Sequence, residues 1–233
     1  AALDPKTAAK VLDLSDRIVS ESHLTTMMVT HNMKDAIAHG NRLIMMYDGK
    51  ILIDVSGEEK KKLPVPQLLE LLKTYSKKKQ IYIVTQFNHP KEITEESTRA
   101  VRMLREAGTT VKNQTVLLKG VNDDGEVLAT LLSKLVSIGV VPYYVFQCRP
   151  VTGVKSQFQV PIARGYGIVE KAKSMQNGQG KCIRYVMSHE TGKIEILGRA
   201  SDREWLFKYH QAKEKADEAR LFTEELADGQ CWL

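Results

Sequence analysis

Hydrophobic positions in the first sixty residues predict a helix, a buried strand and a hairpin. An amphipathic helix is expected over 5–20, with Pro5 at its first position. The apolar run "HLTTMMVT" (23–30) predicts a strand that is buried on both faces. The segment "RLIMMYDGKILIDV" predicts a hairpin that turns at Asp48-Gly49. Together these elements predict a small α/β segment.

From residue 80 onward the pattern repeats a strand followed by a helix. We expect strands at 80–87, 111–118, 141–148 and 182–188, with helices between them at 94–107, 123–138 and 161–175. Repeated β-α units with apolar central strands are typical of a parallel sheet, and we expect a partial parallel (β/α) barrel. Short alternating strands and an acidic, helix-prone tail follow the fourth strand.

A polar, proline-bearing stretch between about 57 and 75 separates the two regions. We therefore expect three parts: a first α/β segment over 1–60, a linker with a short amphipathic helix over 61–80, and the barrel-like region over 81–233.

Composition favours a soluble cytoplasmic protein. The 233 residues carry a net charge of +6, part of it in two lysine-rich runs at 58–62 and 76–80. No aromatic residues are interleaved there, so we expect a solvated face and no nucleic-acid partner. No apolar run reaches the roughly 20 residues that a membrane helix needs. The three cysteines show no C-x-x-C spacing and predict neither a disulfide framework nor a local metal site.

Polar and ionisable side chains follow all four strands of the second region. They are Gln86, Asn88, His89, Lys119, Asn122, Asp123, Asp124, Gln147, Arg149, Ser188, His189 and Lys193. Because parallel strands place their carboxyl ends at one edge, these residues predict a ligand site on one rim.

Single members of this set also have structural explanations. The residues before the second helix, ending at Asp124, are typical of an N-cap, and His89 before Pro90 is typical of a turn. Lys193 also fits a surface position at the start of a strand. Asn113 and Gln114 inside the second strand are either hydrogen-bonded core amides or cofactor-facing residues, because a buried amide without a partner costs about 1–3 kcal/mol.

The first region, residues 1 to about 60, resembles the C-terminal part of an ABC-transporter ATP-binding subunit. The resemblance rests on "ALDP" (2–5), similar to the D-loop, and on "MMVTHNMKDAIAHGNRLIMMYDGKI" (27–51), whose Thr-His pair is similar to the switch histidine. It implies that Asp4 lies at a dimer interface, that His31 senses the γ-phosphate of ATP, and that a membrane transporter is a partner. From its position alone, His31 could equally have no ligand role. The chain has no G-x-x-x-x-G-K-[ST] motif, so we expect it to bind neither ATP nor Mg²⁺ and to hydrolyse no ATP.

The second region, from about 63 to 233, resembles the C-terminal half of lysine 2,3-aminomutase-type (KamA family) radical S-adenosylmethionine proteins. The motifs are "YIVTQFNHPKEITEEST" (82–98), "NQTVLLKGVNDD" (113–124), "VPYYVFQCRPVTG" (141–153) and "MSHETGKIEILG" (187–198). The resemblance implies a partial TIM-like barrel that binds S-adenosylmethionine, a [4Fe–4S] cluster and pyridoxal phosphate (PLP). The chemistry that it implies is migration of an amino group between adjacent carbons of an amino acid.

Two functional positions of the family can be matched to this chain, and at both the sequence differs from that of the lysine-specific members. Lys193 falls where lysine-specific members have a glycine-rich run ending in the PLP-binding lysine, here shortened to "ETG". Arg149 lies where they have an aspartate that recognises the substrate's amino group. Because a cation cannot bind an ammonium, we expect a substrate other than free lysine, such as one with a carboxylate. Asn88, His89, Asn113, Gln114 and Gln147, which lie in or directly after the predicted strands, are cofactor-facing candidates.

The cluster-binding C-x-x-x-C-x-x-C motif does not occur in this chain, and without three thiolates no cluster forms. We therefore expect an incomplete aminomutase that is inactive by itself. The alternatives are an ATP-binding transport subunit and a non-catalytic fusion product. An open half-barrel would expose sheet edges, so we also expect self-association into a homo-oligomer.

Overall fold

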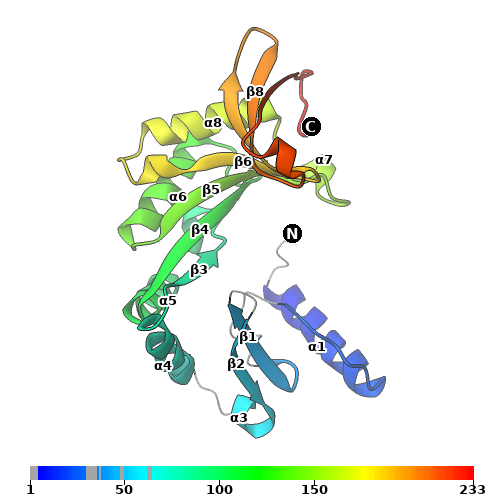
Figure 1. The fold of residues 1–233 in the computed structure, drawn as a ribbon, viewed down its shortest axis with the longest axis vertical. Helices are drawn as coiled ribbons and strands as arrows, with labels where there is room; N and C mark the ends of the chain where they lie inside the picture. The colour runs from blue at the N-terminus through cyan, green and yellow to red at the C-terminus, as the bar shows by residue number, and fades with distance from the viewer. Residues whose placement is uncertain (1–4, 30–35, 37, 48–49, 62–64) are drawn as a thin grey trace. The chain divides into compact units, whose positions relative to one another are not determined.

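The computed structural model describes residues 5–29, 36, 38–47, 50–61 and 65–233 (Figure 1). The chain divides into two compact units between Leu71 and Leu72, a point that lies inside helix α4 (Val65–Ser76). Among the described residues, none of the helices is both long enough and apolar enough to cross a membrane.

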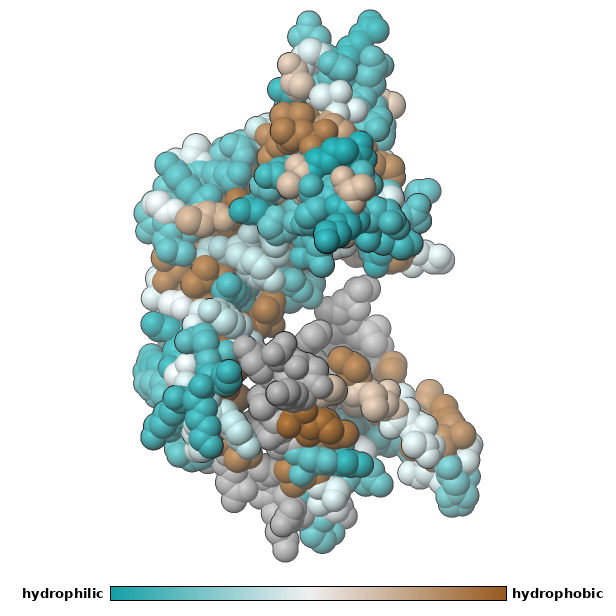
Figure 2. Space-filling model, in the orientation of Figure 1, coloured by the Kyte–Doolittle hydropathy of each residue, from teal (hydrophilic) through white to brown (hydrophobic). Residues whose placement is uncertain are grey.

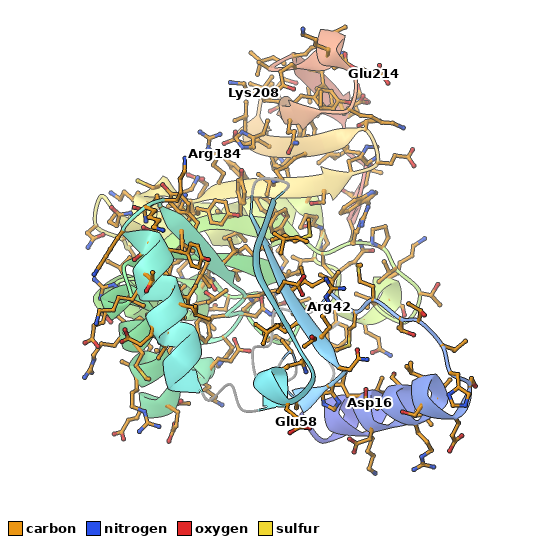
Figure 3. The ribbon with its side chains drawn as sticks, turned by 60° about the horizontal axis from the view of Figure 1, so that its bottom comes forward. Asp16, Arg42, Glu58, Arg184, Lys208 and Glu214 are labelled. Atoms are coloured by element: carbon orange, nitrogen blue, oxygen red, sulfur yellow. The ribbon has the colours of Figure 1, made fainter. Side chains whose placement is uncertain are left out.

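Unit 1 contains a helix and a hairpin. The elements are α1 (Pro5–Glu21), β1 (Arg42–Tyr47), β2 (Lys50–Ser56) and the short α3 (Gly57–Lys61). Strands β1 and β2 pair antiparallel, and Arg42, labelled in Figure 3, donates a hydrogen bond of 2.6 Å to Asp54 across the hairpin. The predicted helix and hairpin are confirmed, whereas Asp48-Gly49 at the expected turn lies outside the described residues.

The buried strand predicted over 23–30 is wrong for the residues that the structure describes there. Residues 24–29 have no regular secondary structure, and Met27 and Val29 are 86% and 85% exposed. A central parallel strand needs a hydrogen-bonding neighbour on each side. In the described part of the chain, β1 and β2 pair with each other and neither pairs with the apolar run. Apolar residues of α1 are also exposed, and Figure 2 shows hydrophobic surface over this helix.

Unit 2 contains one mixed sheet of seven strands in sequential order. The strands are β3 (Ile81–Thr85), β4 (Thr109–Leu117), β5 (Val141–Gln147), β6 (Arg184–His189), β7 (Gly192–Arg199), β8 (Glu204–Ala212) and β9 (Leu221–Glu225). Strands β3 to β6 are parallel, and β6 to β9 are joined antiparallel. The α/β class and the four predicted parallel strands are therefore confirmed, while closure into a partial barrel stays a prediction.

Helices connect the parallel strands and cover one face of the sheet (Figure 1). They are α5 (Glu95–Glu106), α6 (Gly125–Ser137), the short α7 (Lys155–Phe158) and α8 (Ile162–Ser174), with 3₁₀ turns η1 (Pro90–Glu92) and η2 (Gly180–Cys182). A third 3₁₀ turn, η3 (Lys215–Asp217), lies between the antiparallel strands β8 and β9. Alternate residues of β4 are buried against this layer, because successive side chains of a strand point to opposite faces. The core joins leucines of α6 to strand residues such as Val111, Val145 and Met187.

Helix α6 begins after an N-cap residue, Asp124. Asp124 accepts hydrogen bonds from the backbone N–H of Glu126 and Val127 at 2.8 and 3.1 Å, as an N-cap does. These bonds to the carboxylate lower the pKa of Asp124. The predicted helix start is therefore confirmed.

Candidate functional site

The face of the sheet opposite the helices carries the candidate site, and we call it the open face. Its side chains come from alternate positions of neighbouring strands, as the pairings Gln114↔Tyr144↔Arg184 and Ser188↔Lys193 show. The members used below are Lys112, Gln114, Tyr144, Phe146, Arg184, Lys193, Glu195 and His210.

Lys193 lies on this face at the start of β7, opposite Ser188 near the carboxyl end of β6. Its side chain is half-buried, and Nζ lies 4.5 Å from the ring centroid of Tyr144 and 5.8 Å from that of Phe146. An ammonium over an aromatic face is attracted by the ring's electrons. The preceding Gly192 has φ 146°, and an added Cβ would collide with the backbone oxygen of Gln211.

The two adjacent amides Asn113 and Gln114 point to opposite faces. Asn113 is 1% exposed, and its Oδ1 accepts hydrogen bonds from Phe87 N at 2.7 Å and Thr85 Oγ1 at 3.0 Å. Its Nδ2 donates to Phe87 O and Thr115 Oγ1 at 3.1 and 3.0 Å. Asn113 therefore ties the loop after β3 to β4, and Gln114 lies on the open face.

The remaining rim candidates also bond to the chain itself. Asn88 Oδ1 accepts from Val116 N at 2.8 Å, and His89 Nδ1 accepts from Lys91 N at 3.1 Å at the start of η1. Gln147 is buried, and its Nε2 donates to the backbone oxygens of Val160 and Cys231 at 2.6 and 2.8 Å.

Arg149 follows the end of β5 by two residues and is exposed. Asp4 and His31, the residues of the ABC-like segment, lie outside the described residues.

A second cluster on the open face is centred on Tyr144. The Tyr144 hydroxyl and His210 Nε2 lie 2.6 Å apart, and His210 Nδ1 lies 2.7 Å from Arg184 Nη1. Arg184, labelled in Figure 3, also forms an ion pair of 3.7 Å with Glu195. Residues of four strands thus meet beside Lys193.

Electrostatics on this face hold two groups neutral. Burial first, and then the positive charge of Arg184, lower the pKa of His210, because both disfavour a second cation. Burial raises the pKa of Tyr144 above its ordinary value. Tyr144 therefore keeps its proton at neutral pH.

The residues of this chain fit one of the implied cofactors better than another. A [4Fe–4S] cluster needs several thiolates together. In the part of the chain that the structure describes, no group of three His, Cys, Asp or Glu residues could hold a metal, and Cys148 is buried whereas Cys182 is exposed. The residues thus do not fit the cluster. PLP needs an accessible lysine amine beside apolar and hydrogen-bonding groups, which Lys193, Tyr144 and His210 provide.

Sequence reasoning missed Tyr144, Arg184, Glu195 and His210. The first three occupy alternate positions of strands, so a count of polar residues on one strand face could have signalled them. His210 gives no such signal, because the register between β7 and β8 passes from Lys193↔Gln211 to Ile194↔Tyr209 and skips it.

Comparisons with known proteins support the resemblance of the second region. No family model matches the chain. The chain is 46% identical to a protein of Aquifex aeolicus provisionally named L-lysine 2,3-aminomutase. The match extends over 160 residues, which are 68% of this chain and 42% of the relative. The chain is 43% identical over 98 residues, 42% of this chain and 23% of the relative, to the glutamate 2,3-aminomutase of Clostridioides difficile.

A third relative belongs to another class. The tyrosine transport ATP-binding protein of Clostridioides difficile is 51% identical over 70 residues, which are 30% of this chain and 28% of the relative. The chain spans less than half the length of each of these three relatives. For the larger part of the chain, the similarities support a KamA-like radical S-adenosylmethionine family.

Proposed function

We propose that this chain forms the PLP- and substrate-binding part of a 2,3-aminomutase-like protein and that Lys193 bonds to the PLP aldehyde. The observation that supports this most directly is the half-buried position of Lys193 on the open face, with Nζ against Tyr144. When bound, PLP withdraws electrons from the carbon next to an attached amino group. Lys193 fixes the aldehyde end, and the aromatic residues beside it limit access of water.

The experiment is a PLP titration of the purified chain, with visible absorption as the readout. Borohydride reduction followed by peptide mass spectrometry then locates the modified lysine. We expect labelling at Lys193 and its loss in Lys193→Ala. Lys112→Ala is the matched control, because Lys112 also lies on the open face, over the ring of Tyr82 at 4.7 Å. Equal labelling in both variants would contradict the proposal.

We further propose that the substrate carries a carboxylate in place of a second ammonium, and that Arg149 binds it. Arg149 is exposed beyond the carboxyl end of β5, where a guanidinium can pair with a carboxylate in a fork geometry. A relative of this chain is named glutamate 2,3-aminomutase. Glutamate should therefore change the absorption of the PLP-loaded chain at lower concentration than lysine does, and Arg149→Gln should remove this preference. A preference for lysine would refute the proposal.

A second candidate function is that of an ATP-binding transport subunit. The 70-residue similarity to a tyrosine transport ATP-binding protein favours it. In this case Asp4 and His31 would serve a nucleotide site shared with other chain segments, and a membrane transporter would be the partner. Equilibrium dialysis with labelled ATP and Mg²⁺ tests it, and we expect no binding by this chain because it lacks a phosphate-cradling loop.

A further inference from the structure

We propose that Tyr144 donates a hydrogen bond to the phenolic oxygen of PLP held on Lys193, and that Arg184 and His210 fix the direction of this bond. The inference rests on the proposed function and gives a role to three residues to which the sequence analysis assigned none. Tyr144 would touch the cofactor, whereas His210 and Arg184 act through Tyr144 as positioning residues.

The direction of the hydrogen-bond chain follows from Arg184. A guanidinium only donates, so His210 Nδ1, at 2.7 Å from Arg184 Nη1, must accept. A histidine that accepts at Nδ1 is neutral and carries its proton on Nε2. His210 Nε2 therefore donates to the Tyr144 hydroxyl, 2.6 Å away.

The Tyr144 hydroxyl then uses its own hydrogen elsewhere. Its oxygen already accepts from His210, and in the described part of the chain no hydrogen bond joins this hydroxyl to any other residue. Tyr144 is also 9% exposed, so its hydroxyl has few other orientations open to it. A buried donor of this kind binds a ligand oxygen best when that oxygen is negative.

Lys193 would hold such an oxygen near Tyr144. Nζ lies over the Tyr144 ring at 4.5 Å, so an aldehyde carbon bonded to Nζ would lie near the same ring. In PLP the phenolic oxygen is on the ring carbon adjacent to the one that bears the aldehyde. A bond between Lys193 and the aldehyde would therefore bring the phenolic oxygen towards the Tyr144 hydroxyl.

The groups around the Tyr144 hydroxyl include the cation of Arg184, paired with Glu195 at 3.7 Å, and the neutral His210. None of these groups is consumed when PLP bonds to Lys193. The bond to Lys193 itself forms by condensation of the amine with the aldehyde and releases one water, so no oxidant or reductant is needed.

The test compares PLP with its 3-deoxy analogue, which lacks the phenolic oxygen, on wild type and two tyrosine variants. Dissociation constants of both compounds are measured by equilibrium dialysis. Tyr144→Phe should weaken PLP binding about 10- to 100-fold, because it removes a hydrogen bond to a charged oxygen, and should leave binding of the analogue unchanged. Tyr82→Phe, on the exposed part of β3, is the control and should change neither.

The role of His210 is tested with two substitutions. His210→Gln keeps an acceptor for Arg184 and a donor for Tyr144, so it should retain the preference of wild type for PLP over the analogue. His210→Phe breaks the chain and should lose the preference, as Tyr144→Phe does. If Tyr144→Phe fails to fold, as judged by tryptophan fluorescence, the two His210 variants make the same comparison.

The outcomes separate the two proposals. Binding that does not depend on Lys193 refutes the proposed function. Binding that depends on Lys193, with equal effects of Tyr144→Phe on PLP and on the analogue, overturns the role of Tyr144 alone. Loss of the preference in His210→Gln would refute the assigned direction of the chain.

Discussion

Replacement of Asn113 by alanine should destabilise unit 2 strongly, although its neighbour Gln114 should tolerate the same change. Asn113 is almost fully buried and makes four hydrogen bonds that join β3, its following loop and β4. The other partners keep alternatives: Thr85 Oγ1 also donates to Lys112 O at 3.1 Å, and Phe87 O also accepts from Thr115 Oγ1 at 3.0 Å. Phe87 N has no second acceptor in the described part of the chain.

The magnitude follows from these partners. A buried N–H left without an acceptor costs about 1–3 kcal/mol, and each remaining bond contributes about 0.5–1.5 kcal/mol net. Because two partners form other bonds, we expect a total loss of about 2–4 kcal/mol in the free energy of unfolding of Asn113→Ala. Gln114→Ala, on the open face, should stay within about 0.5 kcal/mol of wild type.

Urea unfolding followed by tryptophan fluorescence is the assay. Both tryptophans, Trp205 and Trp232, lie in unit 2, so the signal reports this unit alone. The midpoint should fall in Asn113→Ala with little change in the slope, since the surface exposed on unfolding is similar. A variant Asn113→Ala that is as stable as Gln114→Ala would refute the structural role of this amide.

Two further predictions concern α8 and the open face. In Gly165→Ala the added Cβ would collide with the Tyr185 hydroxyl, so we expect the free energy of unfolding, measured in urea, to fall by about 1–3 kcal/mol. Gly167→Ala, where an added Cβ meets no atom within 4 Å, should instead raise the free energy of unfolding by about 0.5–1 kcal/mol. Equal effects of the two substitutions would contradict the packing of α8 against Tyr185. Burial and Arg184 lower the pKa of His210 from its ordinary value of 6.5, so its contribution to stability is present above pH 6.5 and is lost as the pH falls towards the lowered pKa. The stability of wild type should therefore fall more steeply below pH 6.5 than that of His210→Gln, and parallel curves would exclude this titration.

The strand-helix repeat of unit 2 could be predicted because its signals are local. Each parallel strand is a short apolar run between helices with capping residues, and Asp124 and its neighbours mark a helix start that the structure contains. The strand predicted at 23–30 failed because an apolar run becomes a central strand only beside other strands, and that requirement is not visible within the run itself.

The Tyr144 cluster could not be predicted because it depends on pairing between distant strands. Arg184 and His210 are 26 residues apart, and they meet because β7 pairs antiparallel with β6, and β8 pairs antiparallel with β7. The register skips His210 between β7 and β8, and an unpaired residue of this kind changes the direction of its side chain. Register irregularities have no simple sequence signal.

The tight return between β6 and β7 restricts how the sequence around Lys193 can change. The strand reverses through Glu190 and Thr191, and Gly192 occupies a backbone conformation and a space that suit no larger residue. Successive side chains of a strand point to opposite faces. If one residue were inserted in this return and the register of β7 with its neighbours shifted by one position, the lysine would point to the helix-covered face. A shift of the lysine by one position along β7 would therefore turn its amine from a ligand to the hydrophobic core, whereas a shift by two positions would keep it on the open face.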